Sequence, residues 1–323
     1  MTTQLPHAPV DASNSLVALG RYLQEQGYHF VTPTPLTHQR NLDRDFSLSR
    51  DLRDAFGWNR PFDSSLIPSS LCDPLWELGF ITTEADGRYR SRIRFSTLGG
   101  NLLVHSGFPT DAKDAVFFGP DTYRFVAAIE RHLAGVDPFN TRRVVDICSG
   151  TGAGAFKLAS MLPHAEVWGT DLSQNALLFM AANAELADLT HVRRQESDVL
   201  NALEGTFDLI TANPPYMADV GNRAYRDGGD ELGASLSVRI AKEAIERLAP
   251  GGTLLLYTGT AIVGGRDTFH AGLEPILEAA PVTHTYAELD PDVFSEELLE
   301  SAYSSARVER IAVVLLTVTR APQ

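Results

Sequence analysis

The segment Val144-Val-Asp-Ile-Cys-Ser-Gly-Thr-Gly-Ala-Gly154 decides the fold class, because an apolar run ends there in a glycine-rich turn that opens a helical period. A short apolar run before such a turn is typical of a strand buried in a parallel sheet. Glycines let the backbone approach a ligand closely, and the amide groups of the helix N-terminus face that ligand. The segment predicts a strand–turn–helix unit with a ligand at the turn; a tight turn without a ligand is the alternative.

The residues after this segment continue the alternation of apolar strands and helical periods, which indicates a parallel sheet with crossover helices. The last strand follows a long excursion, which favours an antiparallel strand at that point. We therefore expect an α/β fold with a Rossmann-like, seven-stranded sheet that contains one antiparallel strand. Strands are expected at 143–148, 165–170, 190–195, 207–212, 252–258, 281–289 and 308–318, and helices at 153–162, 174–187, 235–249 and 264–279.

Asp146 separates two interpretations of the glycine-rich turn. Gly150, Gly152 and Ala155 also fit a permissive dinucleotide fingerprint, and Asp171 lies close to the expected distance downstream. A carboxylate four residues before Gly150 would repel a pyrophosphate, but it would attract the cationic amino acid end of S-adenosylmethionine. Because S-adenosylmethionine carries no phosphate, the sequence favours it over a dinucleotide.

Two further carboxylates follow later strands of the predicted sheet. Asp171 closes the strand at 165–170, where it can accept both hydroxyls of a ribose. Asp198 follows the strand at 190–195, where it can hold an adenine amino group with Val199 packed near the ring. An ordinary helix cap is the alternative for each aspartate.

The segment Phe207-Asp-Leu-Ile-Thr-Ala-Asn-Pro-Pro-Tyr216 ends an apolar strand with an asparagine, two prolines and an aromatic residue. The prolines stiffen the loop that presents Asn213. The Asn213 side chain and a neighbouring backbone carbonyl can accept two hydrogen bonds from one NH2 group, and Tyr216 can stack on the flat system that bears this nitrogen. No strong base is needed if the proton leaves after transfer. A rigid Pro-Pro turn with a capping asparagine is the alternative.

These segments resemble the ordered motifs of class I S-adenosylmethionine-dependent methyltransferases of the Asn-Pro-Pro-Tyr group. That group includes release-factor glutamine N5-methyltransferases, adenine N6-methyltransferases and guanine N2-methyltransferases of ribosomal RNA. The resemblance covers about residues 140 to 320. It implies a cofactor site at Asp146, Ser149, Gly150, Gly152, Asp171, Leu172, Asp198, Val199 and Asn213, and a catalytic loop of Asn213, Pro214, Pro215 and Tyr216.

The chain departs from the glutamine enzymes before the first motif. They carry an Arg-Pro-Glu-Thr-Glu-like stretch where this chain has Phe118-Gly-Pro-Asp-Thr-Tyr123, and a helical bundle where it has a different N-terminal region. The lead-in and the run Arg223-Ala-Tyr-Arg-Asp-Gly-Gly229 look like an uncharacterised bacterial group of methyltransferases with its own N-terminal domain. The resemblance therefore leaves the methyl acceptor open.

The first 135 residues form the second predicted unit, a winged-helix-like module of helices and a hairpin. A helix is expected at 12–27, a short helix at 73–79, and a hairpin that joins 80–83 to 88–96. The composition changes at 135–141, so we predict a substrate-recognition domain at 1–135 and a methyltransferase domain at 136–323.

Several residues are candidates for acceptor binding. Four arginines alternate along the expected strand at 88–96, so one strand face would carry a ladder suited to phosphate or an acidic protein surface. A solvated, partly paired face is the alternative for this ladder, and an idle surface loop is the alternative for residues 223–229. The ladder consists of Arg88, Arg90, Arg92 and Arg94; the other candidates are Tyr123, Tyr225 and Arg226.

The formal net charge of −14 disfavours a generic nucleic-acid binder, whose phosphate contacts need a basic surface. We expect no membrane span, no secretion signal and no metal, and a cytoplasmic enzyme whose oligomeric state is open. The sequence predicts an N-methyltransferase that acts on a planar nitrogen, either a protein glutamine amide or a nucleobase amine. A small-molecule N-methyltransferase, an inactive cofactor-binding scaffold and a dinucleotide-dependent oxidoreductase are the alternatives.

Overall fold

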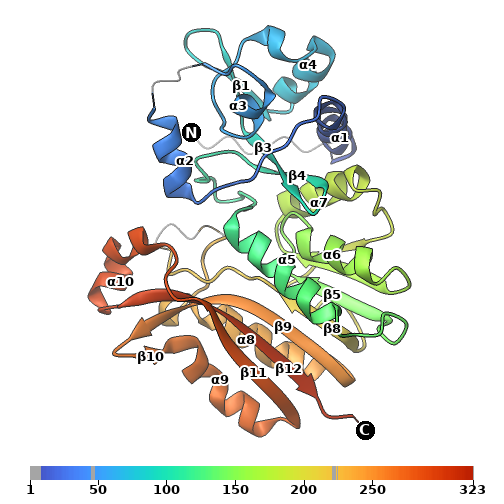
Figure 1. Cartoon of the computed structure of the whole chain (residues 1–323), viewed down its shortest axis with the longest axis vertical. Coiled ribbons are helices and arrows are strands. Elements are labelled where there is room, and N and C mark those ends of the chain that lie inside the picture. Colours follow the sequence, from blue (N-terminus) through green and yellow to red (C-terminus); the bar gives the residue numbers. More distant parts are fainter. Residues whose placement is uncertain (1–8, 45–47, 220–222, 224, 323) are drawn as a thin grey trace.

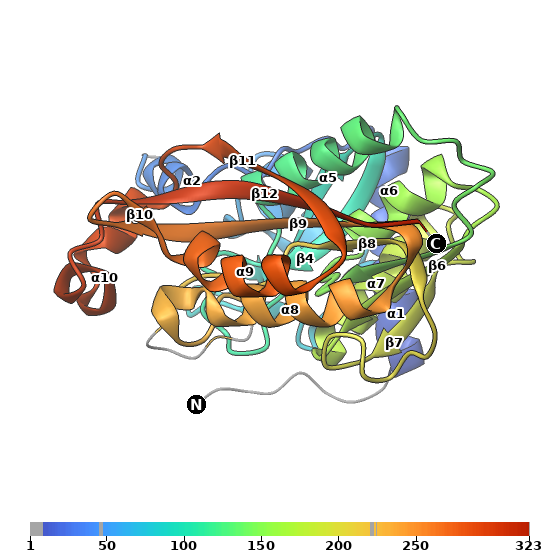
Figure 2. The same ribbon diagram turned by 90° about the horizontal axis from the view of Figure 1, so that it is seen from below.

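The computed structural model describes residues 9–44, 48–219, 223 and 225–322, and a large mixed sheet lies at its centre (Figures 1 and 2). Seven strands follow the order β11–β12–β9–β8–β5–β6–β7. The strands are β5 (Arg143–Ile147), β6 (Glu166–Asp171), β7 (Arg193–Glu196), β8 (Phe207–Ala212), β9 (Leu248–Val263), β11 (Val282–Asp290) and β12 (Arg310–Arg320).

The directions of the strands confirm the expected sheet. Strands β5 to β9 pair in parallel, whereas β12 is antiparallel to both of its neighbours, β9 and β11. The two-residue strand β10 (Arg266–Asp267) pairs with β9 outside this order. The predicted start of a helix at 264 is therefore wrong: Asp267 instead caps the helix that follows, and its Oδ1 accepts from the amide of His270 at 2.9 Å.

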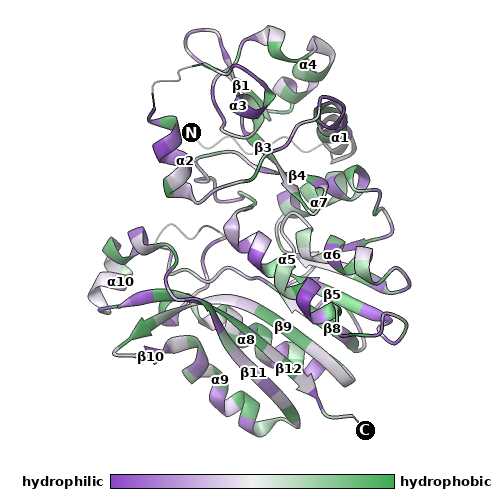
Figure 3. Ribbon diagram, in the orientation of Figure 1, coloured by the Kyte–Doolittle hydropathy of each residue, from purple (hydrophilic) through white to green (hydrophobic). Residues whose placement is uncertain are grey.

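Helices cover both faces of the sheet, so its central strands are buried on both sides. Adjacent residues of β5 point to opposite faces: Val144 packs in the core with α5 and α6, and Val145 in the core with α8 and α9. Figure 3 shows hydrophobic residues along β5 and β9, between these layers. In the part of the chain that the structure describes, no helix has the length and hydropathy needed to cross a membrane. The helices are α5 (Pro120–Leu133), α6 (Ala153–Met161), α7 (Gln174–Leu186), α8 (Ser235–Arg247) and α9 (Thr268–Ala279).

The N-terminal region is a layer of short helices and two hairpins that packs on α7. Its core contains Leu16 and Leu19 and continues into Phe179 and Leu186 of α7. Since α5, which precedes residue 135, packs in the sheet's own core, the division between 135 and 136 stays a prediction. The elements are α1 (Pro9–Glu25), α2 (Pro35–Leu42), α3 (Leu52–Phe56), η1 (Ser64–Leu66), α4 (Ser69–Glu77), β1 (Ile81–Thr83), β2 (Tyr89–Ser91), β3 (Ile93–Leu98) and β4 (Asn101–Ser106).

The arginine ladder expected on one strand face does not form. The chain leaves the β1–β2 hairpin at Arg92, whose carbonyl accepts from the amide of Gly107 at 2.7 Å, and a second hairpin, β3–β4, begins. The prediction of one strand over 88–96 is therefore wrong, and the four side chains have separate environments. Arg88 pairs with Asp86, Arg90 pairs with Glu84, Arg92 is exposed, and Arg94 is buried with its Nε donating to the carbonyl of Ser106 at 3.1 Å.

Three short elements complete the fold beside the carboxyl ends of the strands. One is η2 (Glu231–Gly233), in the loop between β8 and α8. The excursion between β11 and β12 contains η3 (Ser295–Leu299) and α10 (Ser301–Ser305). In Figure 1, α10 and α2 lie on the same side of the molecule, one from each end of the chain.

Candidate active site

Two cavities meet at the carboxyl ends of the parallel strands. The first, here called the strand-end cavity, has a volume of about 430 Å³ and lies over the turns that follow β5 and β6. The second, here called the loop cavity, has a volume of about 280 Å³ and lies between the loop after β8, the turn at 108–111 and Phe294. Both cavities are lined by Phe117, Asn213, Pro215 and Tyr225.

Asp146 is the buried carboxylate of the strand-end cavity, and only 1% of its surface is exposed. Its Oδ1 accepts from the hydroxyl of Thr211 at 2.8 Å, and its Oδ2 accepts from the amide of Ala155 at 3.1 Å. Burial raises the pKa of this carboxyl to about 7, although these hydrogen bonds oppose the rise. A Cβ on Gly154 would lie 2.6 Å from the Asp146 oxygens, so the turn needs glycine there to make room for the carboxylate.

The turn after β5 and the turn after β6 are joined by Asp171. Its carboxylate accepts from the amides of Gly150 and Ser173, each at 2.9 Å. Gly150 has a φ of +53°, a conformation that favours glycine. The next residue, Leu172, is 62% exposed and also lines this cavity. An aspartate and an exposed leucine thus lie side by side at the end of β6. The aspartate suits the hydroxyls of a ribose, and the leucine suits the flat ring attached to that ribose.

Ser149 and Gly152 have different places in the first turn. Ser149 lines the strand-end cavity, and its hydroxyl donates to the carbonyl of Asp146 at 2.7 Å. Gly152 is not among the lining residues; it caps α6 with a φ of +87°. A Cβ at Gly152 would lie 2.6 Å from the ring of Phe156, so this glycine shapes the turn.

Asp198 and Val199 lie at the far end of the strand-end cavity. The carboxylate of Asp198 forms an ion pair with Arg239 of α8, with Nη1 at 3.0 Å from Oδ2. Val199 is buried, and its carbonyl accepts from the hydroxyl of Thr170 at 3.2 Å. Arg239 is a lining residue that the sequence did not predict, because it lies on a helix 41 residues downstream of its partner.

The lining of the strand-end cavity fits a ligand with a positive charge better than a phosphate ligand. The aspartates Asp114, Asp146, Asp171 and Asp198 line it, whereas its lining cations are Lys113 and Arg239, and Arg239 is already paired with Asp198. An excess of carboxylates around a glycine turn favours a cationic amino acid group and a ribose.

Asn213 lies at the junction of the two cavities and directly follows β8. Its side chain is partly exposed, and within the described residues no hydrogen bond to that side chain is formed. Pro214 and Tyr216 line the loop cavity alone. The rings of Phe117 and Tyr225 are parallel at the same junction, with centroids 6.1 Å apart and planes inclined by 8°. The amide group of Asn213 is thus presented between both spaces.

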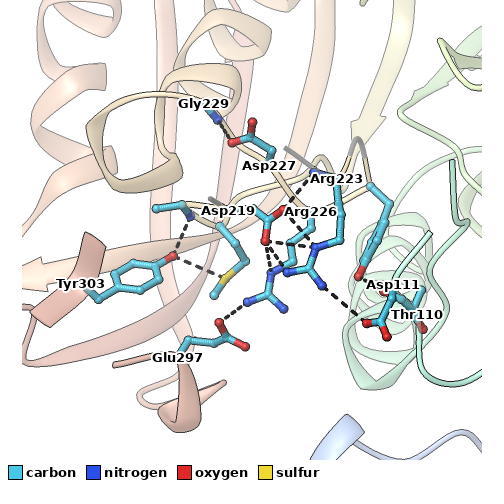
Figure 4. Close-up of polar contacts among 12 residues, drawn as sticks. Thr110, Asp111, Asp219, Arg223, Arg226, Asp227, Gly229, Glu297 and Tyr303 are labelled. Carbon is cyan, nitrogen blue, oxygen red and sulfur yellow. Dashed lines mark hydrogen bonds and ion pairs between the residues drawn. The ribbon is translucent and has the colours of Figure 1, made fainter. Parts of the chain in front are cut away.

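A cluster of ion pairs forms the outer wall of the loop cavity (Figure 4). Asp219 accepts from Nε of Arg223 at 3.0 Å, and this contact lowers the pKa of the Asp219 carboxyl. Arg226 forms ion pairs with Asp219, at 3.4 Å, and with Glu297 of η3. The hydroxyl of Tyr225 donates to the carbonyl of Thr110 at 2.5 Å. The cluster joins the loop after β8 to the C-terminal excursion.

The structure brings Tyr225 and Arg226 to the loop cavity but does not bring Tyr123 to either cavity. The hydroxyl of Tyr123 instead accepts from the amide of Thr32 at 3.2 Å. Sequence reasoning missed Asp121, which accepts from the hydroxyl of Tyr216 at 2.8 Å. Its sequence signal was the lead-in Pro120-Asp121, which begins α5.

Comparisons with known proteins agree with this geometry. The family model described as Methyltransferase small domain matches residues 130–263. The release factor glutamine methyltransferase of Deinococcus radiodurans is 39% identical over 125 residues, 35% of this chain and 44% of that protein. The ribosomal protein uL3 glutamine methyltransferase of Xanthomonas campestris pv. campestris is 28% identical over 221 residues, 64% of this chain and 67% of that protein.

Wild-type Trm5b from Pyrococcus abyssi is a similar solved structure, with a TM-score of 0.48 and 18% identity over 74% of this chain and 62% of that one. The chain spans about half the length of the first curated relatives that it matches. The sheet region is a class I S-adenosylmethionine-dependent methyltransferase domain, and S-adenosylmethionine is its cofactor. Its relatives are named as glutamine methyltransferases of release factors and of ribosomal protein uL3, and the chain is similar to them over the residues given above.

Proposed function

We propose that this protein transfers a methyl group from S-adenosylmethionine to the side-chain amide nitrogen of a glutamine in a protein. The observation that carries the proposal is the junction of two cavities at Asn213, because methyl transfer needs donor and acceptor on either side of one point. The relatives that act on glutamine in release factors and in ribosomal protein uL3 support the choice of acceptor. The protein would act in the cytoplasm, where such substrates are found.

The strand-end cavity would hold the cofactor, whose sulfonium supplies an activated methyl group. Asp146 and the turn at 149–152 would bind its amino acid end, since a buried carboxylate there attracts the cationic amino group. Asp171 would accept hydrogen bonds from the ribose. Leu172 and Val199 would contact the adenine, and Asp198 would accept from its amino group while it keeps its contact with Arg239.

The loop cavity would hold the planar acceptor amide. The Asn213 oxygen and the backbone carbonyl that follows would each accept one hydrogen of the NH2 group and aim the nitrogen at the strand-end cavity. Pro214 and Pro215 would keep this loop rigid, and the ring of Tyr216 would form a wall against the flat group. This nitrogen would take the methyl group of the cofactor, with the S–C bond broken as the C–N bond forms, and the surplus proton would then leave the nitrogen for water.

The charges on the wall of the loop cavity favour a neutral acceptor. Arg223 and Arg226 are paired with Asp219 and Glu297 in the described residues, so these side chains do not offer a free charge to a substrate. An amide side chain is neutral and planar, which suits such a wall. The residues Pro35 and 108–111 also line the cavity, which supports an acceptor-recognition role for residues 1–135 beside a catalytic domain at 136–323.

The test uses S-adenosylmethionine labelled in its methyl group and lysate from cells that lack the gene. We expect wild-type protein, but not Asn213→Ala, to label the protein fraction, and hydrolysis of that fraction to release N5-methylglutamine. Label in RNA would instead identify a nucleobase amine as the acceptor. Label in small molecules would identify a metabolite, and cofactor binding without any label would identify a scaffold.

A further inference from the structure

A buried carboxylate lies directly behind the Asn-Pro-Pro-Tyr loop. Asp121 is 3% exposed, and each of its two oxygens accepts a hydrogen bond from a different tyrosine. The hydroxyl of Tyr216 donates to Oδ2 at 2.8 Å, and the hydroxyl of Tyr257 donates to Oδ1 at 2.8 Å. Asp121 therefore connects the start of α5, the loop after β8 and the strand β9 through side chains alone.

The ring of Tyr216 is held on a second side by β9. Tyr257 and Gly259 are two residues apart on β9, so they face the same side of the sheet. A Cβ at Gly259 would lie 2.2 Å from the Tyr216 ring, which shows that the ring lies directly on the glycine backbone. Tyr216 is thus fixed at its hydroxyl by Asp121 and at its ring by Gly259, and the rest of it lines the loop cavity.

A buried carboxylate is an expensive way, in folding free energy, to make a contact that only stabilises the fold. Burial of a carboxylate costs free energy that hydrogen bonds only partly offset, and an apolar residue of similar size would avoid that cost. Three interactions compensate the charge here: the two tyrosine hydroxyls and Arg124, whose Nη1 lies 3.4 Å from Oδ1. Burial raises the pKa of the Asp121 carboxyl, although these contacts oppose the rise. A buried carboxylate beside the loop cavity therefore indicates a role that an apolar residue could not have.

We propose that Asp121 is a positioning residue for methyl transfer, which sets the Tyr216 ring as the wall against which the planar acceptor is aligned beside Asn213. The proposal rests on the function proposed above. Asp121 reaches the loop cavity through Tyr216, and it reaches β9 through Tyr257. A wall placed to within a fraction of an ångström matters because displacement of about 1 Å in a reacting pair can cost about 100-fold in rate.

A double-mutant cycle separates positioning from simple stabilisation. The variants are Asp121→Asn, Tyr216→Phe and their combination, with Tyr257→Phe as the matched control that removes the other hydroxyl. The probe is labelled S-adenosylmethionine with the protein fraction of cells that lack the gene. We expect Asp121→Asn and Tyr216→Phe each to lower turnover by about 10-fold, and the combination to be no slower than the slower single variant.

Binding of adenosylhomocysteine should stay within about twofold in all four variants, because the strand-end cavity is untouched. Tyr257→Phe should lower turnover only about twofold, since the Asp121–Tyr216 contact remains. Full activity of Asp121→Asn, a combined loss equal to the product of the single losses, or a parallel loss of adenosylhomocysteine binding would overturn the proposal.

A crystal structure of Asp121→Asn with adenosylhomocysteine provides a readout that does not depend on turnover. We expect the Tyr216 ring to move away from Gly259 in that variant; an unmoved ring would overturn the positioning role. If the wild type labels no fraction, the proposed function fails, and this structure still decides on Asp121. If Asp121→Asn does not fold, the same comparison is made with Tyr216→Phe, whose ring should also shift.

Discussion

The strand-end cavity and the loop cavity are adjacent, but they are built in opposite ways. The first is lined mainly by residues that directly follow the parallel strands β5, β6, β7 and β8. The second is lined by segments that lie far apart in the chain, from Pro35 through residues 108–111 to Phe294. A parallel sheet brings strand ends together wherever it forms, whereas an acceptor site on loops changes with every insertion. The residues of the cofactor site can therefore be predicted from this sequence, whereas the identity of the methyl acceptor cannot.

The largest effect is expected at the point where the two cavities meet. Asn213→Ala removes the oxygen that we propose orients the acceptor but leaves the strand-end cavity in place, so turnover should fall by about 100-fold or more while binding of adenosylhomocysteine is kept. Single-turnover transfer of labelled methyl and calorimetric titration would measure the two quantities. The matched control is Asn140→Ala, an exposed asparagine in a distant turn, which should behave as the wild type. Equal turnover in both variants would contradict the assigned role.

The second effect concerns the strand-end cavity alone and depends on pH. The pKa of Asp146 in the folded protein is about 7, well above its ordinary value, so the folded chain holds this proton more tightly than the unfolded chain. The free energy of unfolding contributed by this group therefore falls as the pH rises from about 4 to about 7. The ammonium group of adenosylhomocysteine prefers the ionised carboxylate, so affinity for this ligand should fall about tenfold per pH unit below 7.

Calorimetric titration between pH 5 and pH 8 would measure this slope, with the limits chosen as about one to two units around the pKa of Asp146. In Asp146→Asn the affinity should be low and nearly independent of pH over that range. The pKa of Asp171 is also raised by burial, so a residual slope in this variant would report on Asp171. An unchanged slope in Asp146→Asn would contradict the role of Asp146.

The sequence predicted the sheet because its evidence is local. Apolar runs, glycines and aspartates mark each strand end within a few residues, and β8 was predicted to the residue. The prediction of an arginine ladder was wrong for the opposite reason, because the fold at this point depends on a distant pairing. Arg94 lies in β3, which pairs with β4 in a second hairpin, and its side chain is buried. The alternation of residues along 88–96 contains no information about that pairing. Asp121 was not predicted as a site residue, because its partners Tyr216 and Tyr257 lie 95 and 136 residues away in the sequence. No spacing motif connects residues over such distances.

The third prediction concerns the packing of the Tyr216 ring, which lines the loop cavity, against Gly259 of β9. Gly259→Ala would place a methyl group within 2.2 Å of the Tyr216 ring, so the ring or β9 must move. Overpacking of this kind costs about 1–3 kcal/mol of unfolding free energy. Chemical denaturation would measure the cost, and turnover should fall more than adenosylhomocysteine binding. Gly135→Ala is the control, because its nearest contact would be 3.8 Å away; equal costs in both variants would contradict the close packing.

The smallest effect is expected at the outer wall of the loop cavity. Glu297→Gln removes the negative charge that pairs with Arg226, so the contact between the loop after β8 and η3 is weakened; the two side chains are 17% (Arg226) and 18% (Glu297) exposed. We expect the KM for the acceptor to rise about fivefold, which corresponds to about 1 kcal/mol, with kcat and cofactor affinity nearly unchanged. Glu300→Gln removes the same charge from an exposed position and is the control. If both variants raise KM equally, the overall charge of the excursion matters to the acceptor; if Glu297→Gln alone does, the wall itself is part of acceptor recognition.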